Sequence, residues 1–221
     1  MTRSPLETTF EDLPSELPIF PLNGVLLLPR GRLPLQIFEK RYLAMTADAL
    51  GAPQRLIGMI QPLDKDDKQR NPPVYKVGCA GRITSFSETD DGRFLVTLTG
   101  VCRFAISAEL ELVKGYRRVT PQWDAFADDF ADTPALEVDR SRLLGGLKDY
   151  FKLHGIAANW EAIEQTPEER LVTSLAMICP FEPSEKQALL EAGDLKLRAE
   201  LMATLIEMAL LEHKGSDTAR H

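Results

Sequence analysis

The sequence contains few of the residues from which reactive sites are most often built. Only three of its 221 residues are cysteine and only three are histidine. Cys79, Cys102 and Cys179 form no C-x-x-C pair, and their odd number and wide spacing exclude a disulfide framework. We predict that the three cysteines are small buried side chains, and we expect neither a metal ion nor a cofactor.

The motifs that mark common enzyme classes are also absent. There is no G-x-x-x-x-G-K-[ST] loop and no G-x-G-x-x-G turn, which excludes the usual ATP and dinucleotide sites. Neither G-x-S-x-G nor H-E-x-x-H occurs, so the serine nucleophile elbow and the two-histidine zinc helix are missing. The adjacent carboxylates Asp90-Asp91 and Asp128-Asp129 fall in a turn and a linker, where we expect them to be solvated. We therefore predict no catalytic residues and no enzymatic activity.

The chain lacks a positive charge excess and long apolar runs. Its net charge of −7 repels phosphate backbones and anionic lipids, which argues against nucleic-acid and membrane partners. The longest apolar runs are interrupted by Pro29 and Glu207, and both are far shorter than the ~20 residues of a membrane span. Residues 1–16 are acidic and lack the pattern of a secretory signal. We predict a cytoplasmic protein.

What the sequence does contain is typical of a globular chain, and its first half has a β pattern. Short apolar segments at 17–20, 25–28 and 33–37 are separated by prolines and glycines, a spacing that predicts short strands in a barrel. A helical pattern at 39–50 is followed by a strand at 55–61. Residues 74–88 and 93–99 alternate around the turn 89–92 and predict a hairpin, and β segments continue to 122 with Gly100 as a break.

The second half has helical periodicity. An acidic connector at 124–134 precedes helices expected from about 134 to 155, from 167 to 179, from 184 to 192 and from 195 to 213. We expect the last helix to bury one stripe in a bundle core, namely Leu197, Leu201, Leu205, Met208 and Leu211. The predicted domains are a barrel at 14–123 and a helical bundle at 133–213, with flexible tails at 1–13 and 214–221.

The N-terminal region holds more apolar residues than a small barrel core needs. Most of them should be buried, but part of this set could remain exposed as a binding patch with basic residues at its rim. The candidate polypeptide-binding residues are Leu28, Arg30, Arg32, Leu33 and Arg103.

Several segments together resemble the N-terminal, substrate-binding domain of Lon proteases. They are residues 17–22, 28–29, 33–42, 57–60, 77–83, 91–93, 98–104 and 185–191. The resemblance implies an α+β fold, in which a PUA-like β-barrel with one helix is followed by a C-terminal α-helical bundle. It also implies a role in substrate recognition.

A full-length Lon protease adds an ATPase module and a Ser–Lys peptidase domain, and the sequence has neither. We therefore expect a stand-alone, non-catalytic protein that binds unfolded or degron-bearing polypeptides, with a separate ATP-dependent protease as a further candidate partner. Two alternatives stay open: an adaptor or oligomerisation subunit that uses its C-terminal helices, and a small-molecule-binding barrel. The sequence leaves the oligomeric state undecided.

Overall fold

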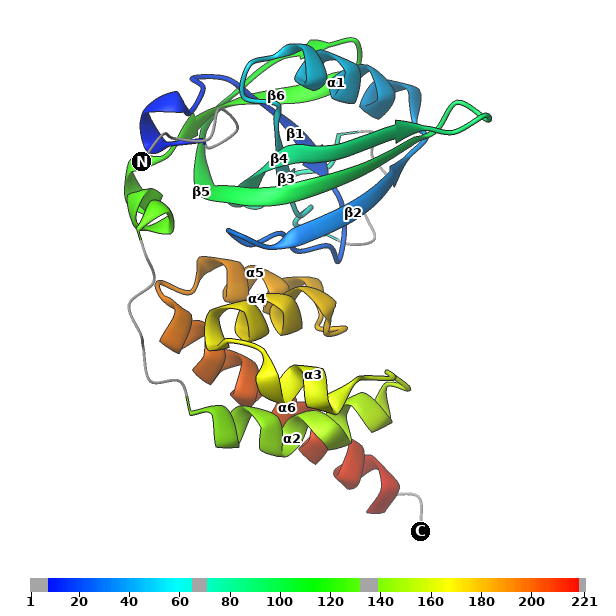
Figure 1. Cartoon of the computed structure of the whole chain (residues 1–221), viewed down its shortest axis with the longest axis vertical. Helices are drawn as coiled ribbons and strands as arrows, with labels where there is room; N and C mark the ends of the chain where they lie inside the picture. The colour runs from blue at the N-terminus through cyan, green and yellow to red at the C-terminus, as the bar shows by residue number, and fades with distance from the viewer. Residues whose placement is uncertain (1–7, 65–70, 132–138, 219–221) are drawn as a thin grey trace. The chain divides into compact units, whose positions relative to one another are not determined.

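The structure is a computed structural model that describes residues 8–64, 71–131 and 139–218. The chain divides into two compact units, Met1–Asp132 and Thr133–His221. Figure 1 shows strands in the first unit and helices in the second. The predicted helix start at 133–134 lies outside the described residues. The arrangement confirms the predicted α+β class, a barrel with one long helix followed by a helical part.

The first unit is a sheet of six strands, five of which close into a barrel. They are β1 (Leu17–Pro21), β2 (Arg32–Ile37), β3 (Leu56–Ile60), β4 (Val77–Glu88), β5 (Phe94–Val113) and β6 (Tyr116–Gln122). The strand order is β2-β5-β4-β3-β1-β6, and an additional β5–β6 pairing closes the barrel. The first part of β5 pairs with β2 and its last part pairs with β6, so β2 lies outside the closed ring as an edge strand.

Phe104 lies at the centre of the barrel core. It is fully buried among apolar side chains that include Leu17, Ile19 and Val119. Glycines make room for its ring: a Cβ at Gly78 would lie 2.6 Å from Phe104 Cζ. Because interiors are close-packed, a side chain at that position would have to displace the ring. Helix α1 (Lys40–Gly51) contacts β1, β3 and β6.

Two predictions about the β region were wrong, and they have one cause. Residues 25–28 form a loop rather than a strand, although Leu28 is fully buried. Gly100 does not end the strand, because β5 runs through it, although the register between β4 and β5 shifts between the pairs Gly81–Gly100 and Ala80–Cys102. A Cβ at Gly100 would lie 2.0 Å from the Leu28 carbonyl oxygen, so only glycine lets the loop pack onto β5 there. The Gly100 amide donates to the Gly31 carbonyl at 2.8 Å and its carbonyl accepts from the Arg30 amide at 2.8 Å.

Residues 8–13, which we predicted as part of a tail, are folded onto the barrel. The short helix η1 (Phe10–Asp12) is closed by reciprocal hydrogen bonds between Thr9 and Asp12. The Phe10 ring meets the Phe130 ring edge-on, with the centroids 6.0 Å apart. Phe130 ends the short helix η2 (Asp124–Phe130), which occupies the acidic connector. The acidic connector is therefore built into the first unit.

The second unit is helical throughout residues 140–153, 160–165, 168–178, 183–191 and 195–218. Its helices are α2 (Arg140–Leu153), α3 (Trp160–Gln165), α4 (Glu168–Ile178), α5 (Pro183–Glu191) and α6 (Leu195–Thr218). α2, α4 and α5 all contact α6, and the core includes Leu147, Val172 and Leu189. α3 was not predicted, and α6 continues past 213, where the sequence predicted a tail.

The predicted core stripe of α6 was wrong except at Leu205. The helix buries Leu195, Ala199, Met202 and Ile206 instead, a set spaced by the 3.6-residue helical period. The contact of this buried face with α2 is close. A Cβ at Gly146 of α2 would lie only 2.9 Å from Ile206 Cγ2. The glycine of α2 therefore leaves room for Ile206 of α6 at this contact.

Candidate functional site

Strands β2, β5 and β4 form a three-stranded surface at the edge of the barrel (Figure 1). The register places Leu35, Val96 and Phe86 in one row across these strands. Pro34, Thr97 and Ser85 form the adjacent row, whose side chains point to the opposite face because strand residues alternate. The surface therefore has two faces with different chemistry.

The face that carries Val96 and Phe86 is part of the barrel core at one end and becomes exposed toward the turn of the β4–β5 hairpin. Val96 on this face is buried in the barrel, whereas Phe86 is 41% exposed. The Phe86 and Phe94 rings pack edge to face with centroids 5.0 Å apart. Phe38 directly follows β2, one residue after the buried Ile37 that pairs with Phe94. Phe38 is 64% exposed, and the Arg93 guanidinium lies 6.0 Å from its ring centroid. We call the three rings at this end of the three-stranded surface, Phe38, Phe86 and Phe94, the aromatic surface.

The other face is a shallow groove of about 400 Å³. Its outward side chains come from two rows across the strands: Pro34, Thr97 and Ser85 in one, Gln36, Leu95 and Ser87 in the other. Leu95 is an exposed apolar side chain among hydroxyl and amide groups. This face therefore offers hydrogen-bonding groups beside one apolar contact.

The free edge of β2 contains a proline. Pro34 has no amide proton, and proline within a sheet is confined to positions whose nitrogen faces away from the neighbouring strand. The free edge of β2 therefore lacks one donor, which weakens pairing with an added strand. This surface is therefore better suited to side-chain contacts with a partner than to pairing with an added strand.

The residues predicted to bind polypeptide are divided by the structure. Arg32 is exposed at the start of β2 and Leu33 beside it is half-buried, so both belong to the three-stranded surface. Leu28 is fully buried in the barrel and cannot contact a partner. Arg30 is exposed, has a left-handed backbone with φ of 63°, and donates from Nη2 to the Ala131 carbonyl at 2.6 Å. Arg103 is buried.

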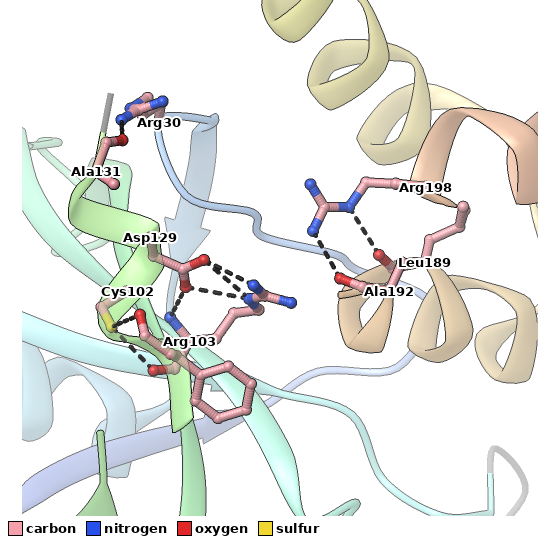
Figure 2. Close-up of polar contacts among 9 residues, drawn as sticks. Arg30, Cys102, Arg103, Asp129, Ala131, Leu189, Ala192 and Arg198 are labelled. Carbon is pink, nitrogen blue, oxygen red and sulfur yellow. Dashed lines mark hydrogen bonds and ion pairs between the residues drawn. The ribbon is translucent and has the colours of Figure 1, made fainter. Parts of the chain in front are cut away.

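The Arg103 guanidinium is held by Asp129, as Figure 2 shows. Asp129 accepts from the Arg103 amide at 2.8 Å and from Nη2 at 2.8 Å, and the guanidinium lies 5.0 Å from the Phe126 ring centroid. The expectation that both Asp128 and Asp129 are solvated was wrong for Asp129, because it fixes η2 to β5. Burial raises the pKa of the neighbouring Cys102 to about 12, so this thiol stays protonated at neutral pH.

A second hollow of about 190 Å³ lies between α1 and strands β1, β3 and β6. Asp48 in its wall accepts from Lys114 Nζ at 2.6 Å and from the Tyr116 hydroxyl at 2.9 Å. The hydrogen bond from Lys114 lowers the pKa of Asp48, and burial raises the pKa of Tyr116 to about 12. Both groups keep one charge state near pH 7, so the arrangement acts as a clamp between α1 and the β5–β6 hairpin.

Residues 8–64, 71–131 and 139–218 hold no cluster of three or more histidine, cysteine or acidic side chains that could bind a metal ion. In the same part of the chain, none of the helices combines the length and the apolar character that crossing a bilayer requires.

Residues 16–208 match the family model of the ATP-dependent protease La (LON) substrate-binding domain. The chain belongs to this family. The match confirms the resemblance noted in the sequence and covers both the barrel and the helical unit.

Relatives of this LON substrate-binding domain are much longer proteins. Lon protease 2 of Myxococcus xanthus is 26% identical over 201 residues, which cover 89% of this chain and 24% of the relative. Lon protease of Anaeromyxobacter dehalogenans is 26% identical over 202 residues, covering 89% of this chain and 23% of the relative. The chain thus spans about a quarter of the length of these proteins.

Two solved structures share the fold. One is a Lon N-terminal domain protein from Xanthomonas campestris, with a TM-score of 0.56, 24% identity and coverage of 86% of this chain and 97% of the other. The second is the N-terminal domain of a Mycobacterium avium complex Lon protease, with a TM-score of 0.58, 15% identity and coverage of 87% and 98%.

In this LON substrate-binding domain, the most exposed apolar residues of the edge surface were missed by the sequence analysis. The surplus of apolar residues was recognised over residues 17–38, but the apolar candidate contacts were placed at Leu28 and Leu33, whereas Phe38, Phe86 and Leu95 are the exposed ones. The alternation of β4 and β5 predicted which residues share a face. The alternation does not show where along the hairpin the barrel stops covering that face.

Proposed function

We propose that this chain binds unfolded or degron-bearing polypeptides through the aromatic surface, without catalysing a reaction, and presents them to a separate ATP-dependent protease. The family is described as a substrate-binding domain, which supports a role in binding protein substrates. The exposure of Phe38 and Phe86 at the end of the barrel core is the single observation that carries the choice of surface.

Exposed aromatic rings are suited to loosely specific binding of unfolded chains. Folded proteins bury most large apolar side chains, so rings that accept such side chains discriminate unfolded from folded polypeptide. Aromatic anchors lose little conformational entropy on binding, because they have few rotatable bonds.

The test is a titration of the full chain into a fluorescently labelled, permanently unfolded polypeptide, followed by anisotropy. The variant F38S/F86S should bind about tenfold or more weakly, since truncating two aromatic anchors removes at least about 1.4 kcal/mol. L112S is the matched control, because Leu112 is an exposed apolar residue near the other end of β5.

Equal weakening by L112S would contradict the choice of surface. Absence of any binding by the unmodified chain at about 1 mM would contradict the proposed function itself. A parallel titration with the same polypeptide in a folded form should give no binding if unfolded segments are what the aromatic surface recognises.

A further inference from the structure

The hollow between α1 and strands β1, β3 and β6 is lined mainly by apolar residues. Its volume of about 190 Å³ has room for about six water molecules, since each occupies ~30 Å³ in the liquid, or for an organic group of about as many non-hydrogen atoms. The apolar residues around it are Pro14, Leu17, Pro18, Ala49, Ala52 and Leu56. These residues offer water few hydrogen bonds, so an aliphatic group is a better occupant than water.

Arg118 brings an incompletely used guanidinium to this hollow. It pairs with Pro18 of β1, and because strand residues alternate it shares a face of β6 with Tyr116, which bonds to α1. Its Nη1 donates to Glu16 at 2.6 Å, and within the part of the chain that the structure describes Glu16 is the one acceptor of this guanidinium. The Nε atom is buried and has no acceptor there. A buried N–H without an acceptor costs free energy, which favours a ligand that supplies one.

The charges at the hollow are balanced, and one of them is replaceable. Asp48 is neutralised by Lys114 and Arg118 by Glu16, each at 2.6 Å. The Glu16 side chain is 55% exposed, and exposed ion pairs of this kind are weak. The carboxylate of a ligand can therefore take the place of Glu16 and keep the balance. A cationic ligand would instead have to displace Arg118 or Lys114 from its carboxylate.

We propose that this hollow binds a carboxylate carried by a short branched aliphatic group, with Arg118 as its anchor and Glu16 as an internal competitor. The ligand carboxylate accepts from Nε and from one Nη of the guanidinium, whereas Glu16 accepts from Nη1 alone. The aliphatic group fills the hollow. Two sources carry this chemistry: a free branched-chain acid, and the C-terminal leucine of a polypeptide. None of the residues of this site belongs to the aromatic surface.

The test is a titration of the full chain, labelled with carbon-13 at its alanine methyl groups, with sodium 3-methylbutanoate at about pH 7. Ala49 and Ala52 line the hollow, so their methyl signals report binding at this place. Both signals should shift and saturate with a Kd of about 1 mM or below. The neutral 3-methylbutanamide and the cationic 3-methylbutylamine have similar shapes, and each should bind at least about tenfold more weakly.

Three variants test the roles of the charged residues. R118Q should weaken binding of 3-methylbutanoate about tenfold or more, because the bidentate donor is lost. E16Q should bind it about two- to fivefold more tightly, because the competing carboxylate is gone. Since Glu16 is largely exposed, E16Q tests the proposal even where R118Q loses the fold. R142Q is the matched control, because Arg142 forms an exposed ion pair with Glu207 in the second unit, and it should bind like the unmodified chain.

Two peptides identify the source of the carboxylate. If chain ends are the ligand, a peptide with a free C-terminal leucine should displace 3-methylbutanoate and its amidated form should not. Displacement by neither peptide supports a free acid as the ligand of the same site. Equal displacement by both peptides would contradict the role of the carboxylate.

The remaining outcomes separate this proposal from polypeptide binding at the aromatic surface. F38S/F86S should leave binding of 3-methylbutanoate unchanged. Equal affinity for the acid and the amide, unchanged affinity in R118Q, or an affinity in E16Q no higher than in the unmodified chain would overturn the proposal. So would the absence of saturable shifts of Ala49 and Ala52 up to about 50 mM acid.

Discussion

Replacing Asp129 by alanine should destabilise the first unit strongly. The Arg103 and Asp129 side chains are 7% and 8% exposed, and Asp129 accepts hydrogen bonds from both the main chain and the guanidinium of Arg103. Removing one partner leaves the other charge buried without compensation, which costs about 3–5 kcal/mol. Loss of Asp129 also releases η2 from β5.

The comparison variant is Asp91→Ala. Asp91 pairs with Arg93 at the hairpin turn, where the two side chains are 58% and 48% exposed. Exposed pairs of this kind contribute about 0–1 kcal/mol, because water screens the charges. Both aspartates form an ion pair with an arginine, but only Asp129 is buried. The loss in free energy of unfolding should therefore be larger for Asp129→Ala than for Asp91→Ala by at least about 2 kcal/mol.

Urea unfolding followed by tryptophan fluorescence measures the effect in the first unit. Trp123 donates its indole N–H to the Pro14 carbonyl at 3.0 Å and packs on Phe104, so its emission reports on the barrel. A Trp160→Phe background removes the signal of the second unit. With a dependence of about 2 kcal/mol per M urea, D129A should lower the midpoint by about 1.5–2.5 M.

A D129A midpoint no lower than that of D91A would refute the reasoning, because burial would then add nothing to this ion pair. Asp129→Asn should lie between the two. It keeps an oxygen that can accept from the Arg103 amide but loses the negative charge opposite the guanidinium.

Two further predictions concern the neighbouring glycines of α2 and the buried thiols. Gly145→Ala should stabilise the second unit by about 0.5–1 kcal/mol, because nothing lies within 4 Å of its Cβ position. Gly146→Ala should destabilise the unit, because the new Cβ would meet Ile206. Thermal melts measure both changes, and a change in stability of the same sign for the two variants would contradict the packing of α2 on α6. Burial raises the pKa of Cys102 and Cys179 to about 12, so both thiols should be protonated and shielded at about pH 8. Thiol-reactive dyes should therefore label them only after denaturant is added. Rapid labelling of the native protein would contradict their burial.

Much of the fold was predictable because local patterns decide it. The hairpin turn at 89–92 was predicted from Asp-Gly, and Gly92 has the expected positive φ of 76°. The end of α2 was predicted at Gly155, which has φ of 65°. The family resemblance was carried by motifs distributed over most of the chain, and the family model covers the same region.

Individual contacts of the candidate site were less predictable, because they depend on groups distant in sequence. Arg93 and Arg103 are both arginines on or beside β5. Arg93 is exposed at the turn, while Arg103 is buried against Asp129, 26 residues further along the chain. No local pattern distinguishes them.

The sequence by itself determined most of the strands and helices, the two-part organisation and the family, since periodicity, turn residues and motifs act over short ranges. Only the tertiary structure decided which apolar residues face solvent. The core-facing side chains of β4 and β5 become exposed at Phe86 because the barrel ends there. Helix α6 leaves Leu197 and Leu211 exposed, whereas Ile206 is buried where Gly146 of α2 approaches it. Exposure is a property of what covers a side chain, and the covering elements come from elsewhere in the chain.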